Sequence, residues 1–388
     1  MHVLVVNPAS YIHEDIEKCL QDMFGKTSVE EYYYVFKGKD VYNNEEFETG
    51  FVKKLAATKY DFVMSTNFYP VVAQICYDRR IRYLAWTYDT PMNVLPCSQM
   101  EYETNYIFLF DRIELKKYQN MGYTRFFHMP LGVDTKKYEK FKPSREYAGD
   151  VTFMGKLYRS QLPYIKHGLS EDLAAFIDKL VSVQGEVREK YIVDELISAP
   201  IIDEINRQYQ QVGRDLSIVK ENLSYAVAEQ VTYYDRVTLL EMMGRRFDTH
   251  LYTYDIGEVE KSVLKHVKIH GVVDYFTKMP VLFKSCKINL NSSLRAAQSA
   301  ISLRALDVLG CGGFLLSNAQ PELMEYFEDK KEVILFHSTE EALELADYYL
   351  KHDEERNRIA AAGLERVKKD FRYDQKMKEM LKIADITD

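Results

Sequence analysis

Residues 287–313 read KINLNSSLRAAQSAISLRALDVLGCGG, and this stretch decides the fold class. An apolar segment at 287–291 is followed by a polar loop, and an amphipathic segment from Ser302 ends in the glycines of 310–313. This order predicts a buried strand, a loop and a helix, which is the repeating unit of a parallel α/β sheet. The amino end of such a helix carries free N–H groups and partial positive charge, so the segment also predicts an anion-binding site.

Two sets of strand-like segments extend this pattern along the chain. Each segment is a short apolar run that ends in a polar turn, and helix-length amphipathic segments separate the runs. Because the carboxyl ends of parallel strands share one edge of a sheet, ligands are expected at the turns that follow them. The expected strands of the first set are 2–7, 61–65, 82–86, 106–110 and 125–129, and those of the second set are 150–155, 250–254, 267–270, 287–291, 314–317 and 332–336.

A helical region interrupts the second set after its first strand. Strand signals are nearly absent from about 160 to 247, and apolar residues recur with helical period at 173–183 and 202–219. We therefore expect an N-terminal α/β domain at 1–145 and a C-terminal α/β domain at 146–372 that contains an all-helical insertion. Helices should close the chain at 339–350, where Ser338 begins a capping box, and at 354–369 and 373–383.

Composition excludes several classes of protein. The 388 residues are 46% hydrophobic and 28% charged, which is typical of a soluble chain with two globular domains. The net charge of −8 disfavours nucleic acid and acidic membranes as partners. Five cysteines without a C-x-x-C pair indicate neither a disulfide framework nor a zinc knuckle and favour a cytoplasmic location. The sequence shows no basic leader and no apolar run of membrane-spanning length.

Motifs of other nucleotide and metal enzymes are missing. The 25–27 segment, GKT, lacks the preceding glycine that a phosphate loop requires, and no G-x-G-x-x-G follows the first strand. There is also no H-E-x-x-H, G-x-S-x-G or Asp-x-Asp. We therefore expect neither NAD nor a metal ion, and any phosphate chemistry should depend on helix dipoles and cationic side chains.

The 287–313 stretch supplies candidate groups for binding a nucleoside diphosphate. Asn291 and Ser292 end the expected strand, and Arg295 or Arg304 would add full positive charge. Asp307 lies three residues after Arg304, where its carboxylate would accept hydrogen bonds from two ribose hydroxyls. The alternative is a surface ion pair between these two residues, with glycines that only cap a helix.

Residues spread over nearly the whole chain resemble one enzyme family. Segments 86–91, 128–134, 150–155, 287–291, 303–316 and 322–323, with tail segments 348–350, 354–356 and 359–367, are similar to the bacterial CgeB-type (spore maturation protein) glycosyltransferases. The resemblance implies the GT-B fold, in which two Rossmann-like domains face each other across a cleft. It also implies that a helix from about Tyr373, within 373–388, crosses back onto the N-terminal domain.

The same resemblance implies a metal-independent glycosyltransferase that uses a nucleotide-sugar, with a UDP-sugar expected, and no other cofactor. The sugar would pass to a protein or glycan acceptor held mainly by the N-terminal domain. Related retaining enzymes carry Glu-x7-Glu, with the first Glu on the donor sugar and the second on the ribose. Asp307 stands at the second position and Ser299 at the first. The choice between retention and inversion therefore stays open.

Further candidates lie at the ends of expected strands. Gly155, with Lys156 and Arg159 after it, would bring backbone N–H groups and positive charge to the diphosphate, or would form an ordinary solvated loop. His270 is expected in the base pocket. Glu322 would contact the sugar or merely open a helix.

The acceptor proton needs a base if the reaction inverts the sugar. Asp89 at a strand end is the first candidate and His13 the second, because a carboxylate or histidine of the N-terminal domain must take that proton. Alternatively, residues 89–91 form a turn or a helix cap. A catalytically silent GT-B protein that binds sugars or acts as a scaffold is the second functional hypothesis, suggested by Ser299 in place of Glu. The sequence does not predict an oligomeric state.

Overall fold

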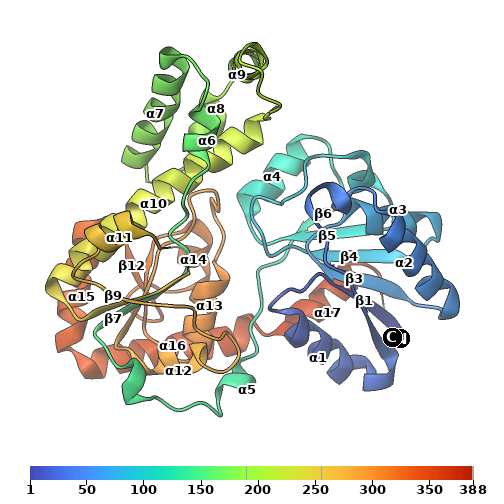
Figure 1. Cartoon of the computed structure of the whole chain (residues 1–388). Helices are drawn as coiled ribbons and strands as arrows, with labels where there is room; N and C mark the ends of the chain where they lie inside the picture. Colours follow the sequence, from blue (N-terminus) through green and yellow to red (C-terminus); the bar gives the residue numbers. More distant parts are fainter. Residues whose placement is uncertain (189, 255, 387–388) are drawn as a thin grey trace.

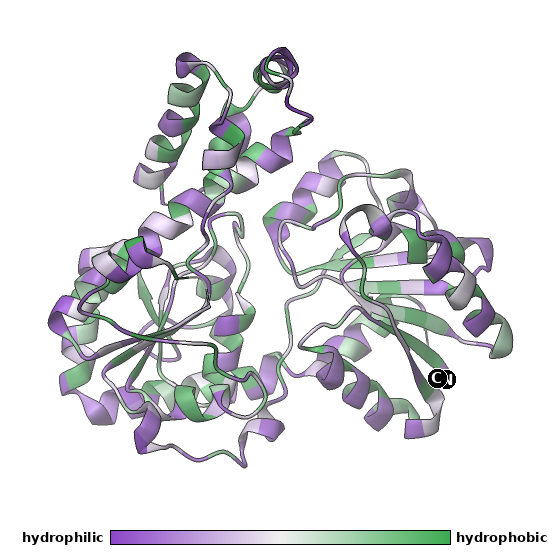
Figure 2. Ribbon diagram, in the orientation of Figure 1, coloured by the Kyte–Doolittle hydropathy of each residue, from purple (hydrophilic) through white to green (hydrophobic). Residues whose placement is uncertain are grey.

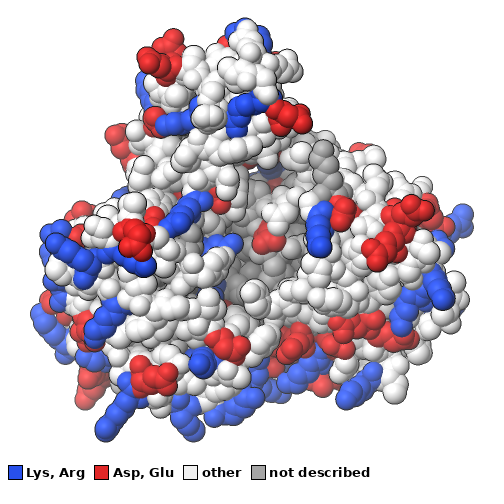
Figure 3. Space-filling view, in the orientation of Figure 1, with Lys and Arg blue, Asp and Glu red and all other residues white. Residues whose placement is uncertain are grey.

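The computed structural model describes residues 1–188, 190–254 and 256–386, without the side chain of Lys39. Two α/β domains stand side by side (Figure 1), and a deep hollow separates them in the space-filling view (Figure 3). The strands of both domains are hydrophobic, whereas the outer surfaces of the helices are largely hydrophilic (Figure 2). The predicted fold class, a GT-B arrangement with a helical insertion, is confirmed.

The N-terminal domain contains a parallel sheet in the order β2-β1-β3-β4-β5-β6. Consecutive connections diverge between β1 and β3, so the topological switch point of this sheet lies there. The strands are β1 (Val3–Asn7), β2 (Val29–Tyr33), β3 (Phe62–Thr66), β4 (Arg82–Trp86), β5 (Asn105–Leu109) and β6 (Phe126–His128), and the helices are α1 (His13–Phe24), α2 (Glu45–Ala57), α3 (Pro70–Asp78) and α4 (Arg112–Asn120).

Strand β2 is absent from the sequence prediction. It pairs with β1 at the edge of the sheet, and its side chains alternate between half-buried or buried and exposed positions. Two glutamates in five residues weaken the apolar signal that revealed the central strands.

The C-terminal domain contains a second parallel sheet in the order β12-β11-β10-β7-β8-β9, which places its switch point between β7 and β10. Every strand predicted from the sequence is confirmed to within two residues at each end. The strands are β7 (Val151–Met154), β8 (Thr249–Tyr252), β9 (Lys268–His270), β10 (Ile288–Asn291), β11 (Leu315–Asn318) and β12 (Ile334–Phe336), and the helices around them are α11 (Glu258–Val263), α12 (Met279–Ser285), α13 (Leu303–Gly310), α14 (Pro321–Tyr326), α15 (Thr339–Lys351) and α16 (Asp353–Asp370).

The helical insertion rises from the C-terminal domain at the top of Figure 1. It comprises α6 (Leu162–Lys166), α7 (Glu171–Glu186), α8 (Val193–Leu196), α9 (Ala199–Gln211) and the long α10 (Lys220–Arg246). The stretch 202–219, which has helical period in the sequence, contains a break between α9 and α10. Helix α9 ends at Gln211 because Gly213 adopts a left-handed conformation with φ of 70°.

Helix α10 belongs to two cores at once. Its amino-terminal half packs Leu223 and Val227 among the insertion helices. Its carboxyl-terminal half packs Leu240 and Met243 against the sheet of the C-terminal domain. The insertion and the sheet are therefore joined by one continuous helix.

The chain passes between the two domains twice. The linker after β6 contains α5 (Thr135–Tyr138), and the backbone of Val133 in this linker donates to the carbonyl of Phe371, 2.9 Å away. Helix α17 (Tyr373–Ile383) then packs on α1. The domain boundaries at 145/146 and 372/373 stay predictions. Short 3₁₀ helices occur at Lys26–Ser28, Gly38–Val41, Ser98–Glu101 and Arg145–Tyr147.

In the described part of the chain, no helix combines the length and the hydropathy needed to cross a membrane.

Candidate active site

The switch point of the C-terminal sheet is bridged by Arg236, a residue of α10 that the sequence analysis did not single out. Its Nη1 donates to the carbonyl of Lys156, in the loop after β7, and its Nη2 donates to the carbonyl of Ser292, in the loop after β10. Gly155 lies between β7 and Lys156, and a Cβ added to it would come within 3.6 Å of the Arg236 Nη1 atom. The two loops that follow the switch-point strands are thus held together by one guanidinium.

Three cationic side chains gather around these loops. Burial lowers the pKa of Arg236 to about 10, which leaves it charged at neutral pH. The pKa of Lys156 is raised, mainly by a hydrogen bond with Tyr254 and also by the negative charge of Asp89 across the hollow. Arg304 is close enough for its charge to contribute to lowering the pKa of Arg236. The site therefore carries a local excess of positive charge in a protein with a net negative charge.

Helix α13 begins beside these loops. The side chain of Ser302 caps its amino end by accepting from the N–H of Ala305 at 3.2 Å. Asn291 is buried, and its amide nitrogen donates to the hydroxyl of Ser317 at 2.9 Å, which fixes the end of β10 against β11. Asn291 and Ser302 thus shape the loop and the helix end, and Asn291 is not exposed to a ligand.

The structure gives Asp307 different partners from those expected. The side chain is 1% exposed, and its Oδ1 accepts from the hydroxyls of Tyr138 at 3.1 Å and Tyr275 at 3.0 Å. Its Oδ2 accepts from Arg304 at 3.1 Å. Burial raises the pKa of this carboxyl, and the Arg304 charge opposes that effect. Asp307 is thus buried among protein partners, and its ribose-binding role stays a prediction.

Three other expected donor residues contact protein groups away from the Arg236 bridge. Arg295 donates from Nε to Asp235 of α10 at 2.6 Å, and Arg159 donates from Nη2 to Glu260 of α11 at 2.6 Å. His270 stacks on Tyr252 with ring centroids 4.5 Å apart.

A buried polar network joins the two domains at the carboxyl ends of β5 and β6. Asp111 accepts from the Ser299 hydroxyl at 2.7 Å, and Glu322 accepts from the same hydroxyl at 2.8 Å. Glu322 also accepts from the backbone N–H of Arg112 at 2.9 Å and contacts Nε2 of His128 at 2.8 Å. Because a hydroxyl has one proton, Ser299 donates to only one of these two carboxylates at a time. Ser299 and Glu322, both expected at the donor sugar, are buried in this interdomain network instead.

On the N-terminal side, Asp89 is held by two amides. Asn67, which follows β3, donates from Nδ2 to Asp89 Oδ2 at 2.8 Å, and Asn93 donates to the same oxygen at 2.8 Å. Among the residues that the structure describes, none donates a hydrogen bond to Oδ1. Asp89 is exposed and lies in a turn, and it does not cap a helix. One carboxylate oxygen is therefore oriented and open.

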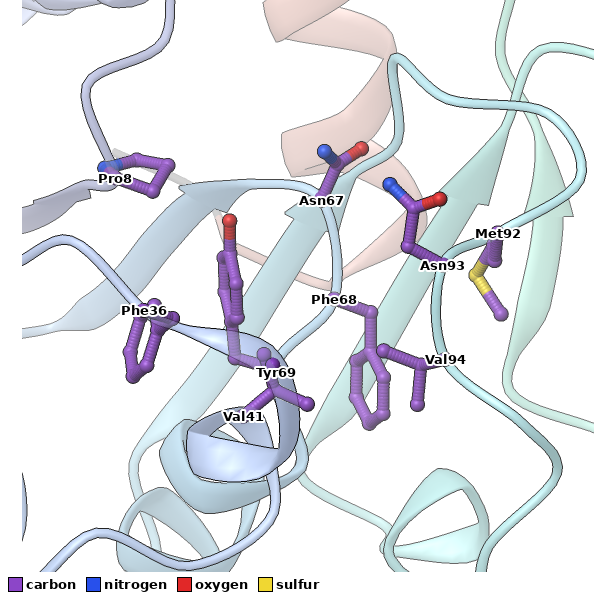
Figure 4. Close-up of a pocket in the computed structure, with 10 residues that line it drawn as sticks. Pro8, Phe36, Val41, Asn67, Phe68, Tyr69, Met92, Asn93 and Val94 are labelled. Carbon is purple, nitrogen blue, oxygen red and sulfur yellow. The ribbon is translucent and has the colours of Figure 1, made fainter. Parts of the chain in front are cut away.

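A pocket of about 390 Å³ lies beside Asn67 and Asn93, at the switch point between β1 and β3 (Figure 4). Tyr69 stacks on Phe36 in its wall with ring centroids 4.4 Å apart. None of its lining residues is charged: Pro8, Phe36, Gly38, Val41, Asn67, Phe68, Tyr69, Met92, Asn93 and Val94. Aromatic faces next to amide groups suit a neutral ligand with hydroxyl groups.

His13, the second candidate base, lies elsewhere in the N-terminal domain. It is buried, and its Nε2 is 3.5 Å from Glu31 of β2 and 3.7 Å from Glu17 of α1. β2 is three strands from β4, which precedes Asp89, and three strand spacings amount to about 14 Å. Burial lowers the pKa of His13. Together with Glu17 and Glu31 it could offer three ligand atoms to a metal ion.

Glu114 of α4 supports the turn that carries Asp89. It accepts from the Thr90 hydroxyl and from the Met92 N–H, each at 2.7 Å. Burial raises the pKa of Glu114 to about 7. An elevated folded-state pKa stabilises the protein below the unfolded value of about 4.3, and this stability is lost as the pH rises to about 7.

The variant Glu114→Gln should therefore stabilise the protein at pH 8 and not at pH 5. We expect the free energy of unfolding to rise by about 1 to 2 kcal/mol at pH 8. The gain is limited to this range because part of the side chain contacts solvent, which screens the charge. Urea unfolding at the two pH values measures the difference. Glu101→Gln, at an exposed position, is the control. An equal effect of Glu114→Gln at both pH values would contradict the prediction.

Comparisons with known proteins agree with this architecture. Residues 236–382 match a family model described as glycosyl transferase-like. No curated protein matches the sequence. Sucrose-phosphate synthase from Thermosynechococcus elongatus is similar with a TM-score of 0.59 and 9% identity, covering 99% of this chain and 98% of that one. HepE from Anabaena, solved with UDP, is similar with a TM-score of 0.56 and 11% identity, covering 99% and 100%. A glycosyltransferase from Rickettsia africae gives 0.57 and 10%, covering 99% and 97%. At these identities the structures show the GT-B fold.

Proposed function

We propose that this protein is a metal-independent glycosyltransferase of the CgeB type, which moves a sugar from a nucleotide diphosphate donor to a protein or glycan acceptor. The observation that carries the proposal is that the switch points of the two sheets lie on opposite sides of the hollow between the domains. The cationic loops after β7 and β10 lie on one side, and Asp89 with its neutral pocket lies on the other. A UDP-sugar is the proposed donor, supported by the UDP bound to the structurally similar HepE.

The cationic side would stabilise the leaving diphosphate. When the bond between the sugar and the phosphate oxygen breaks, its electron pair stays on that oxygen and the diphosphate gains one negative charge, and preorganised positive groups lower the energy of that state. Lys156, Arg304 and the amino end of α13 are placed for this role. In a transfer that inverts the sugar, the open Oδ1 of Asp89 would take the proton from an acceptor hydroxyl as the new glycosidic bond forms.

The catalytically silent hypothesis keeps one observation in its favour. Ser299 and Glu322 are buried between the domains, so neither presents a polar group to a donor sugar in this arrangement. A protein that binds nucleotide or sugar without transferring it would carry the same fold. A cytoplasmic location and the absence of a nucleic-acid partner also stay predictions.

Thermal shift with UDP, GDP, dTDP and CDP in EDTA tests the proposal. We expect one nucleotide to raise the midpoint of unfolding of the native protein without metal, and Lys156→Gln to reduce that shift. Lys179→Gln, an exposed change on α7, is the matched control. If no nucleotide shifts the native protein at millimolar concentration, the transferase proposal is wrong. Binding without sugar release from the matching nucleotide-sugar, over a panel of glycan and peptide acceptors, would favour the silent protein.

A further inference from the structure

Arg236 is a buried cation without an anionic partner in the described residues. Its side chain is 7% exposed, and no salt bridge joins it to a described carboxylate. The neighbouring Asp235 is already paired with Arg295, Nε to Oδ2, at 2.6 Å. A buried charge is costly unless it is paired, so its retention requires a compensating group.

Neighbouring protein groups stabilise the buried charge of Arg236 only in part. The two Nη atoms donate to the carbonyls of Lys156 and Ser292, and the guanidinium lies over the rings of Phe153 and Tyr158 at 5.1 and 4.8 Å. Its Nε is buried and has no hydrogen-bond partner. Carbonyl dipoles and aromatic rings stabilise a cation without cancelling its charge.

The surroundings of Arg236 add further positive charge. Lys156 belongs to one of the two loops that it holds, and Arg304, which is paired with Asp307, lies within electrostatic range. The two loops follow β7 and β10, which flank the switch point of this sheet. In open α/β sheets ligands bind outside the carboxyl ends of the strands at this point. An anion bound there would supply the missing countercharge.

We propose that Arg236 is a positioning residue for a diphosphate at this switch point: it fixes the loops after β7 and β10 and supplies the buried charge that the diphosphate neutralises. The inference rests on the proposed function, because the diphosphate is that of the nucleotide-sugar. It also gives the helical insertion a part in donor binding, since α10 carries Arg236 between the insertion core and the sheet core.

Titrations with UDP, uridine and inorganic pyrophosphate test this role. Arg236→Gln should bind UDP and pyrophosphate about 10- to 100-fold more weakly than the native protein, because it loses one charge-assisted interaction. Its affinity for uridine should change less than threefold. Arg236→Lys retains the charge without the two-carbonyl geometry, so its UDP affinity should fall between those of the native protein and Arg236→Gln. Arg245→Gln, an exposed change on the same helix, should bind like the native protein.

Other outcomes overturn the inference in distinguishable ways. Equal losses for UDP and uridine in Arg236→Gln would show that the residue only maintains the fold of the loops. Unchanged UDP affinity would exclude any role at the diphosphate. If Arg236→Gln does not fold, Arg236→Lys supplies the UDP-to-uridine comparison, and an unchanged ratio contradicts the inference. If the native protein binds pyrophosphate and no nucleotide, the anion site is supported and the proposed function is wrong.

Discussion

Replacing Asp89 by asparagine is expected to lower the turnover of sugar transfer by about 10²- to 10⁴-fold, the range for loss of a positioned general base. The local structure should survive the change. Asn67 and Asn93 both donate to Oδ2, so an asparagine can keep its oxygen there and place its amide where Oδ1 was. The measurement is kcat for nucleotide release with acceptor, using the donor whose nucleotide gives the largest thermal shift.

Two comparisons make the Asp89 result specific. Nucleotide affinity should be the same in Asp89→Asn and in the native protein, because the expected donor site belongs to the C-terminal domain. Asp78→Asn, an exposed change at the end of α3, should leave turnover unchanged. If Asp89→Asn transfers sugar at more than half the native rate, Asp89 serves only to shape the turn, as the alternative from the sequence holds.

Replacing Asp111 by alanine should lower the free energy of unfolding by about 3 to 5 kcal/mol. Asp111 is 1% exposed and performs two tasks. Its Oδ1 caps α4 by accepting from Ile113 at 2.8 Å and Glu114 at 3.1 Å. Its Oδ2 accepts from the Ser299 N–H of the other domain at 3.0 Å. Alanine would leave several buried donors without an acceptor, and urea unfolding measures the cost.

Asn44→Ala is the matched control for Asp111→Ala. Asn44 caps α2 by accepting from Phe47 at 2.8 Å and takes no part in the domain contact, so its loss should cost about 1 kcal/mol. Asp111→Asn retains one oxygen acceptor and should fall between the two. A cost for Asp111→Ala no greater than that for Asn44→Ala would show that the interdomain bonds contribute nothing to stability.

Much of the fold could be predicted from the sequence because its signals are local. The central strands are buried on both faces, as at Val3–Asn7 and Phe62–Thr66, and such strands appear as short apolar runs. The edge strand β2 has one polar face, and it was not predicted from the sequence.

The site was predicted less completely because its decisive contacts join distant residues. Asp307 was chosen from its spacing to Arg304, and that contact exists, but its bonds to Tyr138 and Tyr275 cross other parts of the chain. Spacing cannot reveal such partners. Arg236 lay inside an apolar helical stretch, and a lone cation among buried positions was the signal that could have found it.

The return of α17 to α1 has a consequence for the order in which the molecule assembles. The two helices share one apolar cluster that includes Ile16, Leu20 and Met377, yet most of both domains separates them in the sequence. During translation this apolar surface of the N-terminal domain stays exposed until the C-terminal domain has been synthesised. Completion of the first domain thus depends on a helix that is synthesised after the C-terminal domain. A nascent chain that stalls before Tyr373 would expose this surface to chaperones or to other chains.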